Sequence, residues 1–308
     1  MAVVAVENLT RSFGQIRALD GLSFSVEEGE IFGLVGPDGS GKTTCLRILC
    51  GLVTPTSGKA SVLGMDVTTS SERIKEQVGY MAQPAKLYDD LTVQENIAFY
   101  ADLYGVPPSR YRERMNRLME FSGLAPFTGR LFRNLSGGMK QKVGLSCSLI
   151  HTPKVLFLDE PTNGVDPVSR RDFWKILYEL KRERVTMVVA STYLDEADRC
   201  HRVAFFHRGR VRTVMEPVTL RKLLKASLFN LTASDRRKAL GRLKTLPEIV
   251  NPYVFGTGIH FFLRDPGLLP KLKSDLALAG LSDVQIQPIQ PTLEDVYLSL
   301  LVEKGQEP

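Results

Sequence analysis

The stretch that most constrains this chain is residues 36–43, which read GPDGSGKT and fit the pattern G-x-x-x-x-G-K-[ST]. It follows the apolar run EIFGLV, typical of a buried parallel strand, and precedes CLRILC, which has the character of a helix. In that context the glycines let backbone amides turn onto phosphate oxygens, and the helix directs its positive dipole end at them. The stretch therefore predicts a phosphate-binding loop within an α/β fold.

The side chains of this loop have separate expected roles. Lys42 is expected to reach the β- and γ-phosphates of a nucleotide, and Thr43 is expected to hold Mg²⁺. The remaining residues of the predicted nucleotide-binding loop are Gly36, Pro37, Asp38, Gly39, Ser40, Gly41 and Thr44.

A second motif, VLFLDE at residues 155–160, is an apolar strand that ends in two acids. Carboxylates at the buried end of a strand are costly unless a cation or a reacting water meets them. Asp159 suits Mg²⁺, directly or through water, and Glu160 suits polarisation of an attacking water. Asp-Glu pairs after strands are also common structural features, but beside a phosphate-binding loop this pair is predicted to be catalytic.

A third motif, LSGGM at residues 135–139, precedes a helix. Leu135 leads into Ser136 and the bare backbone of Gly137 and Gly138, which together predict an anion-binding helix start. Such motifs are frequent in loops. Because the phosphate-binding loop already holds the nucleotide of its own molecule, this second anion site is expected to close over the nucleotide of another copy.

The order of hydrophobic patterns predicts two domains. In residues 1–220, antiparallel strands with period-two alternation come first, a helical region inserts at about 85–150, and strands and helices then alternate as in a mostly parallel sheet. The helical region includes TVQE at residues 92–95, a predicted capping box. Residues 221–308 predict a small α+β domain with the order β-α-β-α-β, closed by the helical stretch PTLEDVYLSLL.

Composition limits the setting of the chain. Of its 308 residues, 43% are hydrophobic and 24% charged, and no stretch approaches the roughly 20 apolar residues that cross a bilayer. The amino terminus, MAVVAVENLTRSF, lacks the basic region of a secretory signal, so a cytoplasmic location is expected. A net charge of +6 would suit nucleic acid or an anionic membrane surface. Without a long basic run, no direct nucleic-acid partner is expected.

The motifs stand in the order found in ATP-binding subunits of ABC transporters, and residues 1 to about 215 resemble that family. In this resemblance GPDGSGKT is the Walker A loop, LSGGM the signature and VLFLDEP the Walker B strand. Gln83 in YMAQ falls at the Q-loop, with an expected part in catalysis and at Mg²⁺, and Asp166 in TNGVDP falls at the D-loop. Phe13 matches the family's adenine-stacking aromatic, although an aromatic on a strand is more often simply packed.

The resemblance implies a P-loop ATPase that uses ATP and Mg²⁺, with a parallel core sheet, an antiparallel β subdomain and an inserted helical subdomain. Two such domains bind head to tail, and each ATP lies between one Walker A loop and the opposite signature. Closure and hydrolysis drive separate transmembrane permease subunits, which the ATPase meets on the inner face of the membrane. The carboxy-terminal stretch PTLEDVYLSLL resembles the tail of ATPases that serve drug, antibiotic or polysaccharide exporters.

The chain departs from the family pattern in VVASTYLDEAD, residues 188–198. Members usually carry a histidine four residues before the glutamate of DEA, where it contacts the γ-phosphate and the catalytic carboxylate. Counting back from Glu196 gives Thr192. Thr192 can donate a hydrogen bond but cannot carry charge, and the lost contact is worth about 1.5–3 kcal/mol, roughly ten- to a hundredfold in rate. Asp38, where many relatives carry asparagine, places an acid near the phosphates.

Two pairings follow from this departure. In one, the intact LSGG motif completes the site of a second ATPase subunit, while this chain's own site turns over slowly. In the other, Thr192 suffices and the chain forms a homodimer. Two further functions stand as alternatives: a soluble ABC ATPase acting on nucleic acid or the ribosome, and a regulatory subunit that binds ATP with little hydrolysis. The single P-loop opposes the ribosomal alternative, and the retained Glu160 opposes complete loss of hydrolysis.

Overall fold

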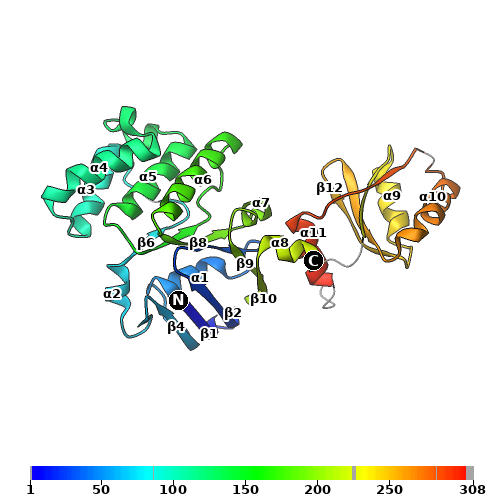
Figure 1. Cartoon of the computed structure of the whole chain (residues 1–308), viewed down its shortest axis with the longest axis horizontal. Coiled ribbons are helices and arrows are strands. Elements are labelled where there is room, and N and C mark those ends of the chain that lie inside the picture. The colour runs from blue at the N-terminus through cyan, green and yellow to red at the C-terminus, as the bar shows by residue number, and fades with distance from the viewer. Residues whose placement is uncertain (1, 86, 224–226, 282, 303–308) are drawn as a thin grey trace. The chain divides into compact units, whose positions relative to one another are not determined.

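The computed structural model describes residues 2–85, 87–223, 227–281 and 283–302 (Figure 1). The chain divides into two compact units, Met1–Val214 and Met215–Pro308. The domain boundary predicted from the sequence falls at residue 220. The predicted ranges also include residues 1, 86, 224–226, 282 and 303–308, which lie outside the described residues.

The first unit is organised around a six-stranded sheet with the order β10-β9-β3-β8-β7-β6. The pairs β9–β3, β3–β8, β8–β7 and β7–β6 are parallel, which confirms the predicted mostly parallel sheet. Every residue of β3, β7 and β8 is buried, as expected for strands of a sheet that is covered on both faces. The strand bounds are β3 Ile31–Val35, β6 Val78–Met81, β7 Val155–Asp159, β8 Thr186–Ser191, β9 Arg202–His207 and β10 Arg210–Met215.

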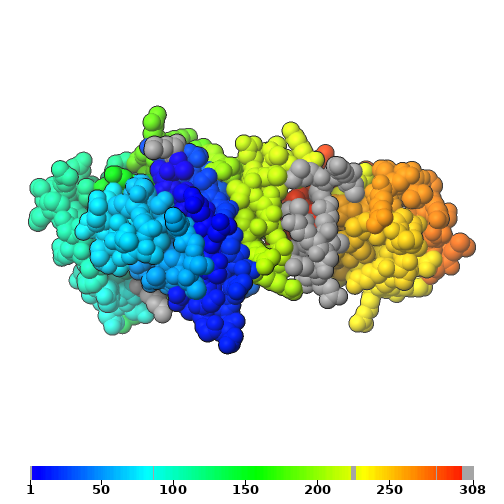
Figure 2. Space-filling model, turned by 90° about the horizontal axis from the view of Figure 1, so that it is seen from below, coloured from blue at the N-terminus to red at the C-terminus, as the bar shows by residue number. Residues whose placement is uncertain are grey.

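A four-stranded antiparallel sheet, with the order β2-β1-β4-β5, forms the second layer of this unit. Its strands are β1 Ala2–Phe13, β2 Ile16–Glu27, β4 Ser57–Val62 and β5 Met65–Asp66. Helix α1, Lys42–Leu49, shares one buried core with both sheets, and this core includes Leu46 of α1, Val4 of β1 and Phe32 of β3. In Figure 2 the amino-terminal strands form a blue surface ridge on this unit.

The predicted helical region has a core of its own, made by Val93, Ile97, Met115, Met119 and Val143 among others. Figure 1 shows its helices α3, α4 and α5 grouped apart from the blue antiparallel strands. The capping box predicted at Thr92 is confirmed: Glu95 N donates to Thr92 Oγ1 at 3.2 Å, and Thr92 N donates to Glu95 Oε2 at 2.8 Å. The helices of this unit after α1 are α2 Ser71–Lys75, α3 Val93–Leu103, α4 Pro108–Ser122, α5 Gly137–Leu149, α6 Pro167–Arg182 and α7 Leu194–Ala197, with 3₁₀ turns at Ala125–Phe127 and Phe132–Asn134.

The second unit holds a four-stranded antiparallel sheet with the order β12-β13-β11-β14. The predicted order β-α-β-α-β is wrong at YVFGTGIHFFLR, which is a hairpin rather than one strand. Phe255 pairs with Gly258 across a two-residue loop, and Gly256 there has φ +54°, which glycine adopts without a steric penalty. Its elements are α8 Pro217–Leu223, β11 Ser227–Thr232, α9 Arg236–Leu243, β12 Ile249–Phe255, β13 Gly258–Leu263, a 3₁₀ turn at Pro266–Leu268, α10 Leu269–Leu278, β14 Gln285–Pro288 and α11 Leu293–Val302. Among the described helices, none has both the length and the apolar character that spanning a membrane requires.

Candidate functional site

The phosphate-binding loop joins the end of β3 to the start of α1. Gly41 caps α1 with φ +106°, and a Cβ at this position would lie 2.6 Å from the carbonyl oxygen of Ala18, so only glycine fits. Because α1 begins at Lys42, its first amides have no acceptor inside the helix and are available to an anion. Within the described part of the chain, the buried Ser40 hydroxyl also finds no hydrogen-bond partner. These unsatisfied donors fit a bound phosphate group.

The Lys42 side chain folds back over this loop. Its Nζ donates to the carbonyl oxygens of Gly36 at 2.8 Å and Pro37 at 3.0 Å, and lies 3.4 Å from Glu160 Oε1. Lys42 and Glu160 are each only 5% exposed. The ammonium group therefore links the loop at the end of β3 to the carboxylate that follows β7.

Asp159, the last residue of β7, receives two hydroxyl donors. Thr43 Oγ1 donates to Asp159 Oδ1 at 2.9 Å, and Tyr80 of β6 donates to Asp159 Oδ2 at 3.2 Å. Burial raises the pKa of Asp159, although both hydroxyl donors act to lower it. Carboxylate and hydroxyl oxygens are the ligands that Mg²⁺ prefers, so Thr43 and Asp159 fit a magnesium site.

Gln83, the third residue predicted at Mg²⁺, lies in the loop after β6 and is exposed. Among the hydrogen bonds of the described residues, none joins it to Thr43 or Asp159, so its metal role stays a prediction. Gln83 instead lines a groove of about 310 Å³ together with Tyr80 of β6 and with Tyr100 of α3 and Gly144 of α5 in the helical region. Tyr80 is a site residue that the sequence analysis missed, since only its pairing across β6 and β7 brings it to Asp159.

Glu160 has a left-handed backbone, with φ +49°, a conformation that costs a non-glycine residue about 1–3 kcal/mol. The turn is fixed by a bond from Glu160 N to Ala190 O at 3.0 Å and by one from Asn163 N to Glu160 O at 3.1 Å. Glu160 Oε2 accepts from both the backbone N and the Oγ1 of Thr192, each at 3.1 Å. The structure thus brings the two predicted residues together.

The environment of Glu160 acts on its pKa in opposite directions. Burial is the largest influence and raises the pKa of the carboxyl group. The charge of Lys42 and the two hydrogen bonds from Thr192 lower it, with a smaller effect. Glu160 is therefore a desolvated carboxylate held in place by fixed donors, which suits a group that must accept a proton or orient a water.

The signature and D-loop residues lie together. Ser136 caps α5, accepting from Met139 N at 3.3 Å, and Asp166 caps α6, accepting from the amides of Val168 and Ser169 at 3.0 Å each. A hydrogen bond from the Ser169 hydroxyl, together with those from the amides of Ser169 and Val168, holds the pKa of Asp166 below its usual value. A Cβ on the buried Gly138 would lie 2.6 Å from Ser169 Oγ, so the two helix starts pack closely.

The other signature residues differ in exposure. Leu135 is buried in the core of the helical region, whereas Gly137 is exposed, and a Cβ added to it would approach only the Gly164 carbonyl oxygen, at 3.5 Å. Phe13 ends β1 and is 45% exposed, with the Arg11 guanidinium carbon 4.4 Å from its ring centroid. Phe13 is therefore not a core residue, and its stacking role stays a prediction.

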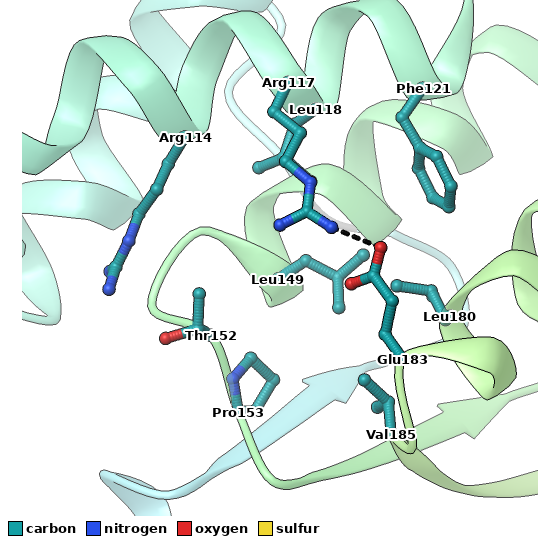
Figure 3. Close-up of a pocket in the computed structure, with 10 residues that line it drawn as sticks. All are labelled: Arg114, Arg117, Leu118, Phe121, Leu149, Thr152, Pro153, Leu180, Glu183 and Val185. Carbon is teal, nitrogen blue, oxygen red and sulfur yellow. Dashed lines mark hydrogen bonds and ion pairs between the residues drawn. The ribbon is translucent and has the colours of Figure 1, made fainter.

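A cavity elsewhere in the first unit offers a competing location for a ligand (Figure 3). It has a volume of about 110 Å³ and is lined by Leu118 and Phe121 of α4 and by Leu180 of α6. The ion pair of Arg117 with Glu183 joins α4 to the end of α6 beside it. Small-molecule sites have volumes of roughly 300–1,000 Å³, so this cavity is too small for a nucleotide, and it contains no residue of the motifs.

Known proteins share this sequence pattern and fold. The family model described as ABC transporter matches residues 19–163. The chain is 38% identical to the "Probable multidrug ABC transporter ATP-binding protein YbhF" of Escherichia coli (strain K12), over 99% of this chain and 53% of that protein. It thus spans about half the length of that relative. It is also 33% identical to the "Nod factor export ATP-binding protein I" of Ralstonia nicotianae, over 97% of this chain and 93% of that protein.

Solved structures agree with these relatives. One titled "Structure of ATP binding subunit of ABC transporter" has a TM-score of 0.65 at 27% identity, covering 72% of this chain and 92% of its own. The dimeric post-hydrolysis ATP-binding cassette MJ0796, bound to ADP and Pi, has a TM-score of 0.64 at 25% identity, covering 69% of this chain and 98% of its own. The predicted P-loop ABC ATPase fold is confirmed. This chain belongs to the ABC transporter family, as an ATP-binding protein of that family.

Proposed function

We propose that this chain binds and hydrolyses ATP and thereby powers an ABC-type membrane exporter. The observation that carries the proposal is the meeting of Lys42, Thr43, Asp159 and Glu160 at the carboxyl edge of the parallel sheet. This edge is where α/β proteins bind their ligands. A phosphate-binding loop, two magnesium ligands and a desolvated carboxylate are the parts that ATP hydrolysis requires.

Each residue has a role in the proposed reaction. The first amides of α1 and the Ser40 hydroxyl bind phosphate oxygens, while Thr43 and Asp159 would hold Mg²⁺. Bound Mg²⁺ would neutralise charge on the β- and γ-phosphates. Glu160 orients and polarises the attacking water, and Thr192 holds Glu160 in place.

The contact between Lys42 and Glu160 indicates the order of these steps: the nucleotide binds before Glu160 accepts a hydrogen bond from water. Lys42 lies at Glu160 Oε1, while Thr192 occupies Oε2, so both oxygens of the base have partners. A nucleotide phosphate attracts the same ammonium group. When Lys42 moves to the phosphate, Oε1 becomes free to accept a hydrogen bond from water. Substrate binding therefore releases the base.

The proposal includes a dimer and membrane partners. A head-to-tail dimer would place the exposed Gly137 and Ser136, which caps α5, on the nucleotide of the opposite chain, as the solved dimeric cassette supports by analogy. Separate permease subunits would dock at the groove lined by Gln83, with the chain peripheral on the inner face of the membrane. Export is supported by relatives named for multidrug transport, Nod factor export and daunorubicin/doxorubicin resistance.

One observation favours a second candidate, a regulatory subunit that binds ATP with little hydrolysis. Thr192 occupies the position where the family resemblance expects a histidine, and a threonine cannot supply a positive charge to the transition state. Such a subunit would require a second, active ATPase chain as its partner. Against this candidate, Thr192 still gives Glu160 two hydrogen bonds.

Steady-state Mg-ATP hydrolysis, measured over a wide range of protein concentration, tests the proposal. Turnover per chain is expected to rise with concentration as dimers form. The isosteric Glu160→Gln variant is expected to lower it roughly 10²–10⁴-fold with nucleotide binding retained. Wild-type turnover no higher than that of Glu160→Gln at any concentration, with ATP bound, would overturn hydrolysis and support the regulatory candidate.

Mixing two inactive variants tests the composite site. Gly137→Asp places an acid at an exposed position of the signature where a side chain meets no close neighbour. A mixed dimer of Gly137→Asp and Glu160→Gln chains contains one site with an intact Walker A loop, base and opposite signature. The mixture is expected to recover turnover that neither variant has alone. No recovery would contradict the head-to-tail arrangement.

A further inference from the structure

A buried cluster of polar side chains lies next to the segment that holds Glu160. Ser191 and Glu196 belong to VVASTYLDEAD and Thr162 to TNGVDP, but no role was assigned to them above. At its centre is Glu196 of α7, only 1% exposed. Glu196 Oε1 accepts from Thr162 Oγ1 at 2.5 Å and from Trp174 Nε1 at 3.0 Å, and Oε2 accepts from Ser191 Oγ at 2.8 Å. The donors come from the turn after β7, from α6 and from the end of β8. Through these hydrogen bonds, the Glu196 carboxylate connects α7 to the turn after β7, to α6 and to β8.

The cluster continues into the segment that holds Glu160. Ser191 Oγ also accepts from Tyr193 N at 3.0 Å, so Ser191 links Glu196 to the backbone beyond Thr192. The peptide unit between Thr192 and Tyr193 is planar, so a bond at Tyr193 N limits the orientation of Thr192 as well. Thr192 in turn donates from N and Oγ1 to Glu160 Oε2.

Contacts with Arg170 of α6 hold the side chain of Tyr193. The Arg170 guanidinium carbon lies 4.0 Å from the Tyr193 ring centroid, and Arg170 also reaches Asp195 Oδ2 at 3.6 Å and Glu196 Oε1 at 4.0 Å. Cation–π contacts of this kind are worth about 0.5–1 kcal/mol or more. The loop after β8 is thus fixed through its backbone and through its aromatic side chain.

Stability alone is a weak reason for a carboxylate at this position. Buried ionic groups are often replaced by apolar residues without loss of stability, because desolvation offsets their attraction. Glu196 instead accepts one of its three hydrogen bonds from Ser191, and the next residue, Thr192, donates two hydrogen bonds to Glu160. Since one of the two Thr192 donors is a backbone amide, the position of the loop matters for Glu160 as much as the identity of the side chain.

We propose that Glu196 is a positioning residue for ATP hydrolysis, which acts on the base Glu160 through Ser191 and Thr192. This inference rests on the proposed function. It assigns catalytic importance to a residue outside the phosphate-binding loop, the signature and the strand that carries Asp159. It also explains how the site orients its base with a threonine where the family resemblance expects a histidine.

Ser191→Ala removes the link and leaves the bonds of Glu196 to Thr162 and Trp174 in place. The hydroxyl makes two hydrogen bonds, to Glu196 and from Tyr193 N, and their loss predicts a kcat about five- to tenfold lower, with unchanged KM for Mg-ATP and unchanged nucleotide affinity. The matched control is Ser122→Ala in α4. Ser122 is 3% exposed against 2% for Ser191 and donates only within its own helix, so the same chemical change is expected to leave kcat unaltered.

Two further variants separate positioning from general packing. Glu196→Gln keeps the size of the side chain and an acceptor for Thr162 and Trp174, but it removes the acceptor for the Ser191 proton. Because the glutamine amide can still donate to Ser191 Oγ, it is expected to lower kcat in the same direction as Ser191→Ala but by less. In the Glu160→Gln background, Ser191→Ala is expected to have no further effect, because it acts through the carboxylate that is already lost.

The outcomes separate this inference from the proposed function. If both Ser191→Ala and Glu196→Gln keep the wild-type kcat, the positioning role is overturned while ATP hydrolysis stands. The same holds if Ser191→Ala lowers kcat by the same factor in the Glu160→Gln background as in the wild type. A kcat loss in Ser122→Ala as large as that in Ser191→Ala also overturns it. A wild-type chain with no more turnover than Glu160→Gln overturns both.

Discussion

Each unit of the molecule contains a buried carboxylate that accepts several hydrogen bonds. It is Glu196 in the first unit and Asp295 in the second. Both accept from a threonine hydroxyl and from an aromatic donor. For Asp295 these are Thr292, at 2.5 Å to Oδ2, and the Tyr253 hydroxyl, which donates to Oδ1. In local chemistry the two clusters are alike.

They differ in where their hydrogen bonds lead. Asp295 also accepts from Thr292 N at 2.6 Å and donates its own amide to Thr292 Oγ1 at 3.3 Å, so it closes a capping arrangement at the start of α11. A further neighbour, His260 Nδ1 at 2.8 Å from Asp295 Oδ1, is buried in β13. Among the described residues, the hydrogen bonds of Asp295 all end within the second unit. One of the three hydrogen bonds of Glu196 leads through Ser191 to the clamp, meaning the two hydrogen bonds from Thr192 to Glu160. A buried carboxylate therefore shows its role by the groups at the end of its hydrogen bonds rather than by its burial.

The largest expected effect concerns the cluster in the second unit. Asp295→Ala leaves the donors of Tyr253 and Thr292 without an acceptor in the interior, and is expected to lower the free energy of unfolding of that unit by about 3 kcal/mol or more. Tyr253→Phe removes one donor and leaves Asp295 satisfied, so a loss of about 1 kcal/mol is expected. Chemical unfolding measures both values.

Hydrolysis measured on the same Asp295→Ala chain sharpens the comparison. Because the hydrogen bonds described for this cluster do not lead to Glu160, kcat is expected to fall less than in Ser191→Ala when both are measured at saturating protein and Mg-ATP. A larger loss of kcat in Asp295→Ala would show that the second cluster also serves the reaction, and the contrast between the two units would fail.

The next largest effect is expected for variants of Thr192, which donates the two hydrogen bonds of the clamp to Glu160. Thr192→Val keeps the shape of the side chain and the backbone donor but removes one hydrogen bond to Glu160, so kcat is expected to fall roughly fivefold. Thr192→His introduces a donor that can carry charge, and a rise in kcat of roughly tenfold is expected. Single-turnover hydrolysis distinguishes these changes from effects on nucleotide binding. A histidine variant no faster than wild type would mean that threonine is fully adequate at this position.

The features predicted correctly from the sequence have signals within a few adjacent residues. The capping box at Thr92 and Glu95 is encoded by a spacing of three residues, and the parallel core by short apolar runs. The hairpin at Gly256 was missed because apolar residues continue on both sides of the turn and conceal the break. The same reason explains why the predicted order of the second unit lacked one strand.

The missed site residues depend on contacts between distant segments. Glu196, in the first turn of a helix, has the sequence character of an exposed acid that complements the helix dipole. Its burial follows from Trp174, 22 residues away, and Thr162, 34 residues away. Tyr80 reaches Asp159 only because β6 pairs with β7 in a register that sets Tyr80 opposite Phe157. No local pattern carries either relation.

The smallest expected effect is a shift in pH dependence, and it connects the clamp to the charge of the base. Burial raises the pKa of Glu160, whereas Lys42 and the two Thr192 donors lower it. Glu160 must be ionised to polarise water, so kcat is expected to fall on the acid side at a higher pH than for an exposed glutamate. The same raised pKa makes the ionised carboxylate unfavourable to folding at neutral pH. This penalty decreases as the pH falls below the folded-state pKa and is gone below the unfolded-state pKa.

Removing a donor that lowers this pKa must raise it further. In Thr192→Val the acid limb of the kcat profile is therefore expected to move to higher pH. Ser191→Ala loosens the same clamp without removing a donor, so its shift is expected in the same direction and smaller. Ser122→Ala and Asp295→Ala should leave the limb in place, because neither residue bonds to the clamp. Two results would contradict the assignment of Thr192 as the group that stabilises the ionised base. One is an acid limb that moves to lower pH in Thr192→Val, and the other is a limb that moves as far in Asp295→Ala as in Thr192→Val.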